Sequence, residues 1–477
     1  MRTTIKHKEA LFILLICCLV SRVLTTIYYI EDTDSLRFAL SINDYDITKL
    51  QPHFPGYPVY CFLAKILYFF TKSFAVSFSI LGALSIFGII FFLLKIMNTE
   101  LQTIKGALLA GLVFFNPLFW LMSNRYMPDL MGLAFTLSAF YFLCFENNYD
   151  KKLLKSFLLM GLLAGVRLSY LPVLIVPACY NFFYSNKKIY LILAFAGGCF
   201  IWLVPLIWIT GIENLFSAAL KQTQGHFADF GGTIITESNS LKRLLMIIRS
   251  IWADGLGGYW IDRSWQTFFL SFFMIYTIYL GLKNLKELKK KENYFIFFSF
   301  VIVYGLWIFF FQNVIYKSRH ILPLLIPFIL VLYHGGLVLL KRRNVIYMFT
   351  LGPFFIFLAN ITIVLCLQHK NPSAISSIKD QLIINDKNQV VVSTPLINYY
   401  LKHNGVVAEF FDIDSANDIQ NIINMKKDSL TLVGNFKDNF LKEYELISDS
   451  TFFHNPYVNQ MWSEISIYRM ASKTNVD

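Results

Sequence analysis

Long apolar runs separated by short polar segments dominate the chain up to about residue 370. They lack the strict alternation of half-buried strands, and most of them approach the ~17–25 residues that an α-helix needs to cross a bilayer. At that length per span we expect about eleven membrane-spanning helices. Their approximate bounds are 9–29, 74–94, 106–122, 130–146, 153–168, 170–184, 189–210, 266–283, 294–311, 320–340 and 345–366.

The run at 56–71 is predicted to lie along the membrane surface. It is short, and Lys65 stands in its middle. An isolated lysine at the centre of a bilayer costs about 2.5–3.5 kcal/mol on insertion scales, so an interfacial helix is the less costly alternative. A crossing here would also reverse every later loop and place the basic segments KNLKELKKK and KRR outside. The predicted N-terminus is therefore cytoplasmic, and the predicted C-terminus is external. The first apolar run reaches about residue 29 without a small-residue cleavage site, so we expect an uncleaved first span.

The pattern changes near residue 370, where polar residues replace the apolar runs. The segments VVVST, VVAEFF and LTLVG are typical of short strands, and INYYLKH and SANDIQNIINMKK are typical of helices. We expect a membrane module over 1–369, whose first external loop spans 30–73, and a small external α/β domain over 370–477. The predicted fold class is mainly α: a polytopic membrane protein with about eleven spans, an interfacial helix and that external domain.

Composition agrees with a multi-span membrane protein. Of the 477 residues 56% are hydrophobic and only 15% are charged, and the mean hydropathy is +0.54. A soluble globular protein is about a quarter charged, so an ordinary cytosolic enzyme is excluded. The net charge of +12 is interpreted as basic cytoplasmic loops, because no basic helix or stacking platform indicates nucleic acid. The seven cysteines lie in apolar stretches and predict neither disulfides nor a zinc site.

The first external loop carries the clearest chemistry. Glu31, Asp32 and Asp34 follow the first predicted span almost directly. Carboxylates grouped at a membrane exit can hold a divalent cation, or one of them can act as a general base. A solvated acidic loop without a role is the alternative.

The same loop continues into the sequence QPHFPGYP, whose three prolines and one glycine predict a stiff, non-helical turn. This turn fixes His53 and Tyr57 ahead of the helix at 56–71. His53 can exchange hydrogen bonds with a substrate, or it can simply cap the turn.

Two later patches are predicted on the same face. The segment SNRYMPDLMG at 123–132 contains Arg125 and Asp129, and Asp129 falls in the first turn of a helix, where a carboxylate is favoured and simple capping is the alternative. The segment QNVIYKSRHILPLLIP at 312–327 contains three groups that suit a lipid phosphate or else extend to headgroups: Lys317, Arg319 and His320. Arg167, in GVRLSYLP, is a further cation at the edge of a span.

The acidic Asp-x-Asp pair, the short helix after it and the H-[PF]-P-G-Y-P turn resemble the first loop of the membrane glycosyltransferase-C superfamily. The resemblance is to its protein O-mannosyltransferase and aminoarabinose-transferase-like branch, and Phe54 replaces the commoner proline of the turn. It implies a polytopic membrane glycosyltransferase with its active site outside. The composition, rich in Lys, Ile, Asn and Phe, is typical of bacterial proteins, so we expect a bacterial cytoplasmic (inner) membrane. The resemblance also implies a polyprenyl-phosphate-linked sugar as donor, with an acceptor that is a protein, a lipid or a glycan.

The resemblance implies roles for the residues above. The catalytic base would be Asp32 or Asp34. Substrate or acceptor binding would involve Glu31, His53, Tyr57, Arg125 and Asp129. The donor phosphate would be bound by Lys317, Arg319 and His320. A divalent metal ion, Mg or Mn, would be held by Asp32, Asp34 and Asp129.

Two other classes of protein remain alternatives. A transporter or lipid-linked glycan flippase would place ionisable residues at the middle of its spans, often within inverted repeats. Here the charged candidates cluster in predicted external loops, and no repeat is visible in the sequence. A polysaccharide polymerase or ligase acting on a lipid-linked glycan is the other alternative.

Overall fold

A computed structural model of the chain describes residues 7–145, 149–229, 233–285, 295–342, 345–384 and 389–473. The predicted basic loops at 283–293 and 341–344 lie largely outside these residues. The chain divides into a helical unit, Met1–Thr26 with Leu40–Leu367, and a C-terminal unit, Ile27–Ala39 with Gln368–Asp477. No sequence pattern indicates that residues 27–39 group with the C-terminal residues.

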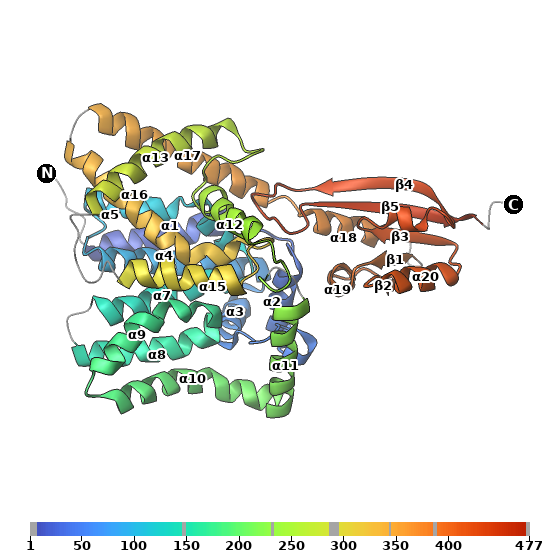
Figure 1. Cartoon of the computed structure of the whole chain (residues 1–477), viewed down its shortest axis with the longest axis horizontal. Coiled ribbons are helices and arrows are strands. Elements are labelled where there is room, and N and C mark those ends of the chain that lie inside the picture. The colour runs from blue at the N-terminus through green and yellow to red at the C-terminus, as the bar shows by residue number, and fades with distance from the viewer. Residues whose placement is uncertain are drawn as a thin grey trace. The chain divides into compact units, whose positions relative to one another are not determined.

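The helical unit consists of helices joined by short turns (Figure 1). Its first part contains α1 (His7–Leu24), the last turn of α2 (Thr33–Asn43), η1 (Ile47–Lys49), α3 (Pro58–Thr71), α4 (Phe74–Ile96), α5 (Ile104–Phe114), α6 (Pro117–Asn124), α7 (Asp129–Cys144), α8 (Tyr149–Arg167), η2 (Leu168–Tyr170) and α9 (Pro172–Tyr184). Its second part contains α10 (Lys188–Thr210), α11 (Ile212–Gln224), η3 (Gly225–Asp229), α12 (Ser240–Arg249), η4 (Ser250–Gly255), α13 (Trp265–Leu285), η5 (Phe297–Val303), α15 (Tyr304–Phe311), η6 (Ser318–Ile321), α16 (Leu322–Arg342) and most of α17 (Val345–His369).

Six described helices are long and apolar enough to cross a membrane, and the number rises to seven if one bent pair counts as a span. The six are Phe74–Ile96, Lys151–Tyr170, Lys188–Thr210, Trp265–Asn284, Ser318–Lys341 and Phe349–Ile384. Four shorter apolar helices occupy Pro58–Thr71, Asp129–Cys144, Pro172–Tyr184 and Phe297–Phe311. The multi-pass helical architecture is confirmed, but the predicted count of about eleven is not, because several apolar runs form helices shorter than a usual span of ~17–25 residues.

One predicted span is broken in the middle. The run at 106–122 forms α5 and α6, which are bent by 58° with respect to each other. The side chain of Asn116 accepts a hydrogen bond of 3.0 Å from the backbone of Phe119, and Pro117 occupies the first position of α6. Asparagine is a favoured helix cap, and proline at that position gives up an N–H that has no helical partner. The Asn–Pro pair therefore starts a new helix inside an apolar run.

Small residues allow close packing of long helices. Figure 1 shows α8 between α7 and α10, and it contacts both of them. A Cβ atom on Gly198 of α10 would lie 2.3 Å from the carbonyl oxygen of Leu158 and 3.0 Å from Cα of Gly161, both in α8. Such small-residue contacts let membrane helices approach to backbone distance. These contacts pack α10 closely against α8, the helix that ends at Arg167.

The C-terminal unit contains a five-stranded sheet with the order β2-β1-β3-β5-β4. The strands are β1 (Val390–Ser393), β2 (Glu409–Asp412), β3 (Ser429–Val433), β4 (Tyr444–Phe453) and β5 (Glu464–Ser472), and the helices are α18 (Ala374–Ile384), α19 (Pro395–His403), α20 (Ala416–Asn424) and α21 (Lys437–Phe440). Strands β1, β2 and β3 are parallel, because α19 and α20 connect them as crossovers. Strand β5 is antiparallel to both β3 and β4.

The apolar core of this sheet explains why its first three strands are predicted from the sequence. Val392, Leu430 and Leu432 are buried against Met470 of β5 and Ile422 of α20. The predicted small α/β domain is therefore confirmed as a fold. Strands β4 and β5 were not predicted, and β4 in particular exposes most of its residues, so it lacks an apolar alternation.

Candidate active site

Three side chains from separate parts of the helical unit contact Arg167, the last residue of α8. Its Nη2 atom lies 3.0 Å from Oδ1 of Asp129. Its Nη1 atom donates to the hydroxyl of Tyr57 at 3.1 Å, and Nη2 also lies 3.4 Å from Nδ1 of His320. All four residues are buried. We call Tyr57, Asp129, Arg167 and His320 the Arg167 cluster.

Asp129 enters the cluster through the start of a helix. It is the first residue of α7 and is fully buried. The partial positive charge at a helix N-terminus favours a carboxylate there, and the guanidinium of Arg167 supplies a full positive charge. Removing one partner of a buried ion pair typically costs about 3–5 kcal/mol, since the other charge is left uncompensated. The two side chains therefore depend on each other.

Gly132, in the first turn of α7, makes room for the stem of Arg167. A Cβ atom at this position would lie 2.6 Å from Cβ of Arg167 and 3.2 Å from Cδ2 of Tyr170. Real Cβ atoms essentially never approach so closely. The absence of a side chain thus allows the end of α8 to lie directly on the start of α7.

Tyr57 reaches the cluster from the proline-rich turn. Its backbone has φ 47° and ψ 45°, the left-handed region, which is rare for a bulky residue. Nε2 of His53 lies 3.1 Å from the Tyr57 hydroxyl, and the two rings meet edge to face at 5.3 Å. The hydroxyl of Tyr45 donates to the carbonyl of Gly56 at 2.8 Å and closes the turn. The turn therefore presents His53 and Tyr57 together, next to Arg167.

A short polar stretch precedes the turn and is itself ordered by side chains. Partial burial opposes the charged form of Asp46, but hydrogen bonds from the Thr48 hydroxyl and backbone, together with Lys49, lower the pKa of this carboxyl. The Nζ atom of Lys49 also lies 2.9 Å from Asp44. These contacts fix η1 just before the turn.

The third predicted patch supplies His320 and two neighbouring cations. Arginine can only donate hydrogen bonds, so Nδ1 of His320 is the acceptor in its contact with Arg167. The backbone carbonyl of His320 accepts from the hydroxyl of Tyr304 at 3.0 Å. Arg319 is buried beside it in η6, and Lys317, just before η6, is partly exposed.

The structure places Arg125 at the end of α6. Its side chain is buried, and Nη1 donates to the sulfur of Met122 at 3.8 Å. Arg125 thus lies at the start of the turn that joins α6 to α7, and Asp129 is the first residue of α7.

The three predicted carboxylates of the first loop lie in the C-terminal unit and are buried there. Oδ1 of Asp32 accepts a 2.8 Å hydrogen bond from the backbone of Ser35, so Asp32 caps α2. Oδ1 of Asp34 lies 3.6 Å from Nη1 of Arg37, one turn later in α2. Glu31 pairs with His369. We call these residues, Glu31 to Asp34, the acidic segment.

The described residues do not match a metal site. Among them, no three His, Cys, Asp or Glu side chains stand close enough together to hold an ion. Asp129, one of the predicted ligands, uses its carboxylate against the guanidinium of Arg167.

Nearly the whole chain is similar to a solved structure. The crystal structure of ArnT from Cupriavidus metallidurans bound to undecaprenyl phosphate aligns with 96% of this chain and 97% of its own, with a TM-score of 0.54 and 8% identity. The apo structure of the same protein gives a TM-score of 0.53 at 9% identity over the same shares. The chain has the same fold as ArnT.

The fold implied by the turn and the acidic pair is thereby confirmed. The zinc- and sulfate-bound oligosaccharyltransferase of Archaeoglobus fulgidus reaches a TM-score of only 0.41 at 10% identity, over 83% of this chain and 62% of its own. Neither protein-family models nor curated proteins give a match to the sequence. The structural likeness to ArnT therefore establishes the fold of the chain.

The sequence did not identify Arg167 as the centre of the cluster. Arg167 is the residue that contacts Tyr57, Asp129 and His320, although nothing local in the sequence distinguishes it from other basic residues at span ends. The available signal was its position between two apolar runs, because ionisable residues at membrane depth usually have a functional partner. Tyr304, which supports His320, had no sequence signal.

Proposed function

We propose that this protein is a membrane glycosyltransferase that transfers a sugar from a polyprenyl-phosphate-linked donor to an acceptor outside the cytoplasm. The observation that carries the proposal is the Arg167 cluster, a buried polar site inside an apolar helical unit. Its fold is that of ArnT, which has been crystallised with undecaprenyl phosphate. A lipid-linked donor also explains why a transferase is built from apolar helices, since its substrate resides in the bilayer.

The donor phosphate is assigned to the residues around η6. Arg319 can bind a phosphate with two parallel hydrogen bonds, and Lys317 adds a second positive charge. With Nδ1 of His320 occupied by Arg167, its Nε2–H remains as a neutral donor. These groups would stabilise the negative charge that grows on the phosphate as the bond to the sugar breaks.

The base is assigned to Asp32 or Asp34. Both lie at the start of α2, where the helix dipole favours the ionised carboxylate that a base requires. The acceptor oxygen or nitrogen attacks the anomeric carbon and gives its proton to the carboxylate. The bond between that carbon and the phosphate oxygen breaks, and polyprenyl phosphate leaves with the electron pair.

The remaining residues are assigned to positioning and acceptor binding. Asp129 holds Arg167, which donates to the Tyr57 hydroxyl, which in turn meets His53. This series of contacts places a phenol and an imidazole at the edge of the cluster. An acceptor hydroxyl can bind there.

A direct assay tests this function. The protein is purified in detergent and incubated with a panel of polyprenyl-phosphate sugars, and the release of polyprenyl phosphate is measured. We expect turnover with at least one donor, a raised donor KM in Arg319→Ala, and partial recovery in Arg319→Lys, which lacks the bidentate contact. Arg243→Ala is the matched control, because Arg243 is a buried arginine that donates to backbone carbonyls of α15.

The control should lower thermal stability and leave the donor KM unchanged. No turnover with any donor, together with movement of polyprenyl-linked lipid across reconstituted vesicles, would instead identify a flippase. Equal donor KM values in wild type, Arg319→Ala and Arg319→Lys would remove η6 from donor binding.

A further inference from the structure

Residues far apart in the sequence fix the backbone of the acidic segment within the C-terminal unit. The hydroxyl of Tyr400, in α19, donates to the carbonyl of Ile30 at 2.5 Å. The hydroxyl of Ser373, just before α18, donates to the carbonyl of Glu31 at 2.9 Å. Buried carbonyls need such partners, and these two are supplied from more than 340 positions later in the chain. The loop therefore takes its conformation from the C-terminal residues.

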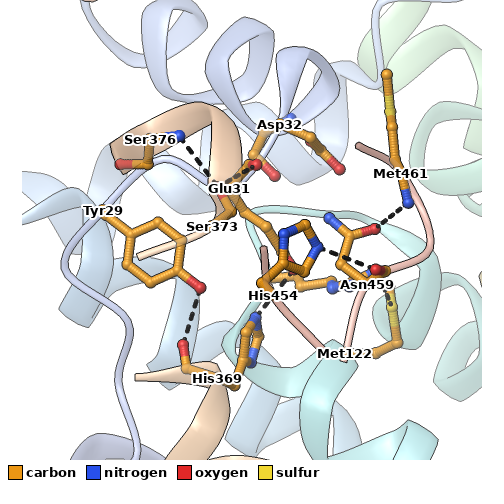
Figure 2. Close-up of polar contacts among 12 residues, drawn as sticks. Tyr29, Glu31, Asp32, Met122, His369, Ser373, Ser376, His454, Asn459 and Met461 are labelled. Atoms are coloured by element: carbon orange, nitrogen blue, oxygen red, sulfur yellow. Dashed lines mark hydrogen bonds and ion pairs between the residues drawn. The ribbon is translucent and has the colours of Figure 1, made fainter. Parts of the chain in front are cut away.

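Side chains reinforce the same attachment, as Figure 2 shows. Nε2 of His369 lies 3.2 Å from Oε1 of Glu31, and both side chains are about 2% exposed or less. The hydroxyl of Tyr29 donates to the carbonyl of His369 at 2.9 Å. The side chain of Glu31 thus contacts a buried partner at the end of α17. A side chain held in this way fixes the structure and is not available to bind an acceptor.

Hydrogen bonds also connect the residues around Ser373 to the segment that follows β4. The Ser373 hydroxyl also accepts from the backbone of Ser376 and so caps α18. The next residue, Ala374, donates from its backbone to Nδ1 of His454 at 3.0 Å, and Nε2 of His454 bonds the carbonyl of Asn459. The sheet, the start of α18 and the acidic segment are consequently joined by one series of hydrogen bonds (Figure 2).

We infer that the C-terminal unit serves to position the acidic segment, and that Glu31 is a positioning residue. His369, Ser373 and Tyr400 fix residues 30–31 and thereby set the direction in which Asp32 and Asp34 leave the backbone. The consequence for catalysis rests on the proposed function, in which one of these two carboxylates is the base. The attachment itself does not depend on it.

Two measurements test the inference, one of activity and one of structure. Tyr400→Phe, His369→Gln and Glu31→Gln each remove one contact with little change of shape, and Tyr444→Phe is the matched control, a buried tyrosine of the same unit whose ring packs in the sheet core. We expect kcat to fall by about tenfold or more in the three variants while the donor KM changes by less than about twofold, as for a group acting only on the base. Tyr444→Phe should leave both unchanged.

The structural measurement is the rate at which a thiol at residue 35 reacts. Ser35→Cys is buried and bonded through its backbone to Asp32, so a maleimide should modify it slowly. Adding His369→Gln should raise that rate by about tenfold or more as the segment opens. In the Glu31→Gln/His369→Gln double variant, kcat should be no lower, and the labelling rate no higher, than in the more strongly affected single variant. This is expected because the two side chains act as one unit.

The outcomes separate this inference from the proposed function. Faster labelling in a protein that turns over no donor would leave the attachment standing and overturn the function. Unchanged labelling and unchanged kcat in all three variants would overturn the attachment. A raised donor KM with constant kcat in Glu31→Gln would place Glu31 in binding, and an equal response in Tyr444→Phe would reduce the effect to general loss of stability. Either result contradicts the positioning role.

Discussion

The guanidinium of Arg167 lies 3.0 Å from the carboxylate of Asp129, and the two side chains are 8% and 0% exposed. The pair joins the end of α8 to the start of α7, and the guanidinium of Arg167 also contacts Tyr57 and His320. One ion pair therefore sets the geometry of a site assembled from four parts of the chain.

Breaking this pair from either side should destabilise the protein and inactivate it. Asp129→Asn or Arg167→Gln leaves an uncompensated buried charge, at a cost of about 3–5 kcal/mol. The double variant should recover much of that stability, since neither charge remains, but not the activity, because Tyr57 still lacks its donor. Thermal unfolding in detergent and the donor assay measure the two effects. Full activity in the double variant would exclude the pair from the mechanism.

Gly132→Ala should disturb the site by displacing Arg167. The added Cβ would lie 2.6 Å from Cβ of Arg167, so α7 and α8 must separate, and we expect lower activity and a lower unfolding temperature. Gly197→Ala is the control, because a Cβ there has nothing within 4 Å. That control should be neutral or stabilised by up to about 1 kcal/mol through helix propensity. Indistinguishable behaviour of the two variants would show that Arg167 has room to move.

Asp32 allows its capping role to be separated from its charge. Asparagine caps a helix as well as aspartate does, so Asp32→Asn should keep the hydrogen bond to Ser35 and the stability while removing the base. If Asp32 is the base, turnover should fall by about 10²–10⁴-fold. Asp32→Ala should in addition lose about 0.5–2 kcal/mol of stability with the cap. The same comparison with Asp34→Asn decides which carboxylate is the base, and full activity in the double asparagine variant would remove the acidic segment from the reaction.

The predicted topology can be tested with three exposed positions. Thr48→Cys and His403→Cys should react with an impermeant thiol reagent added to intact cells, whereas Gln102→Cys should react only after the membrane is opened. The native cysteines lie in apolar helices and should contribute little background. Labelling of residue 403 only from the cytoplasmic side would mean that the helix at Pro58–Thr71 crosses the membrane or that another span is miscounted.

Local signals in the sequence predicted the helices and part of the site. Apolar runs locate the helices because burial in lipid or protein requires them, and the rigid turn of QPHFPGYP does bring His53 to Tyr57, since both lie within one short segment. The break at Asn116 was also legible in principle, because asparagine followed by proline is a helix-start signal. The continuous apolar run around this pair predicted a single span instead, although the helix-start signal decides the structure there.

Contacts between distant residues could not be predicted in this way. Arg167 and Asp129 are brought together by the packing of two helices, and Glu31 meets His369 only after the whole helical part of the chain has intervened. Strand β4 escaped prediction for a different reason. Most of its residues are exposed, and its register shifts between Leu446 and Ser448, so no apolar alternation marks it.

The late position of His369, Ser373 and Tyr400 has a consequence for biosynthesis. A ribosome adds about 5–20 residues per second, so Ile30 and Glu31 wait roughly 20–70 s between their own synthesis and the appearance of their partners. During that interval the acidic segment lacks the hydrogen bonds that define it in the finished molecule. A nascent chain can thus insert its helices without presenting ordered carboxylates, and the acidic segment becomes ordered only after residues 369–400 have been synthesised.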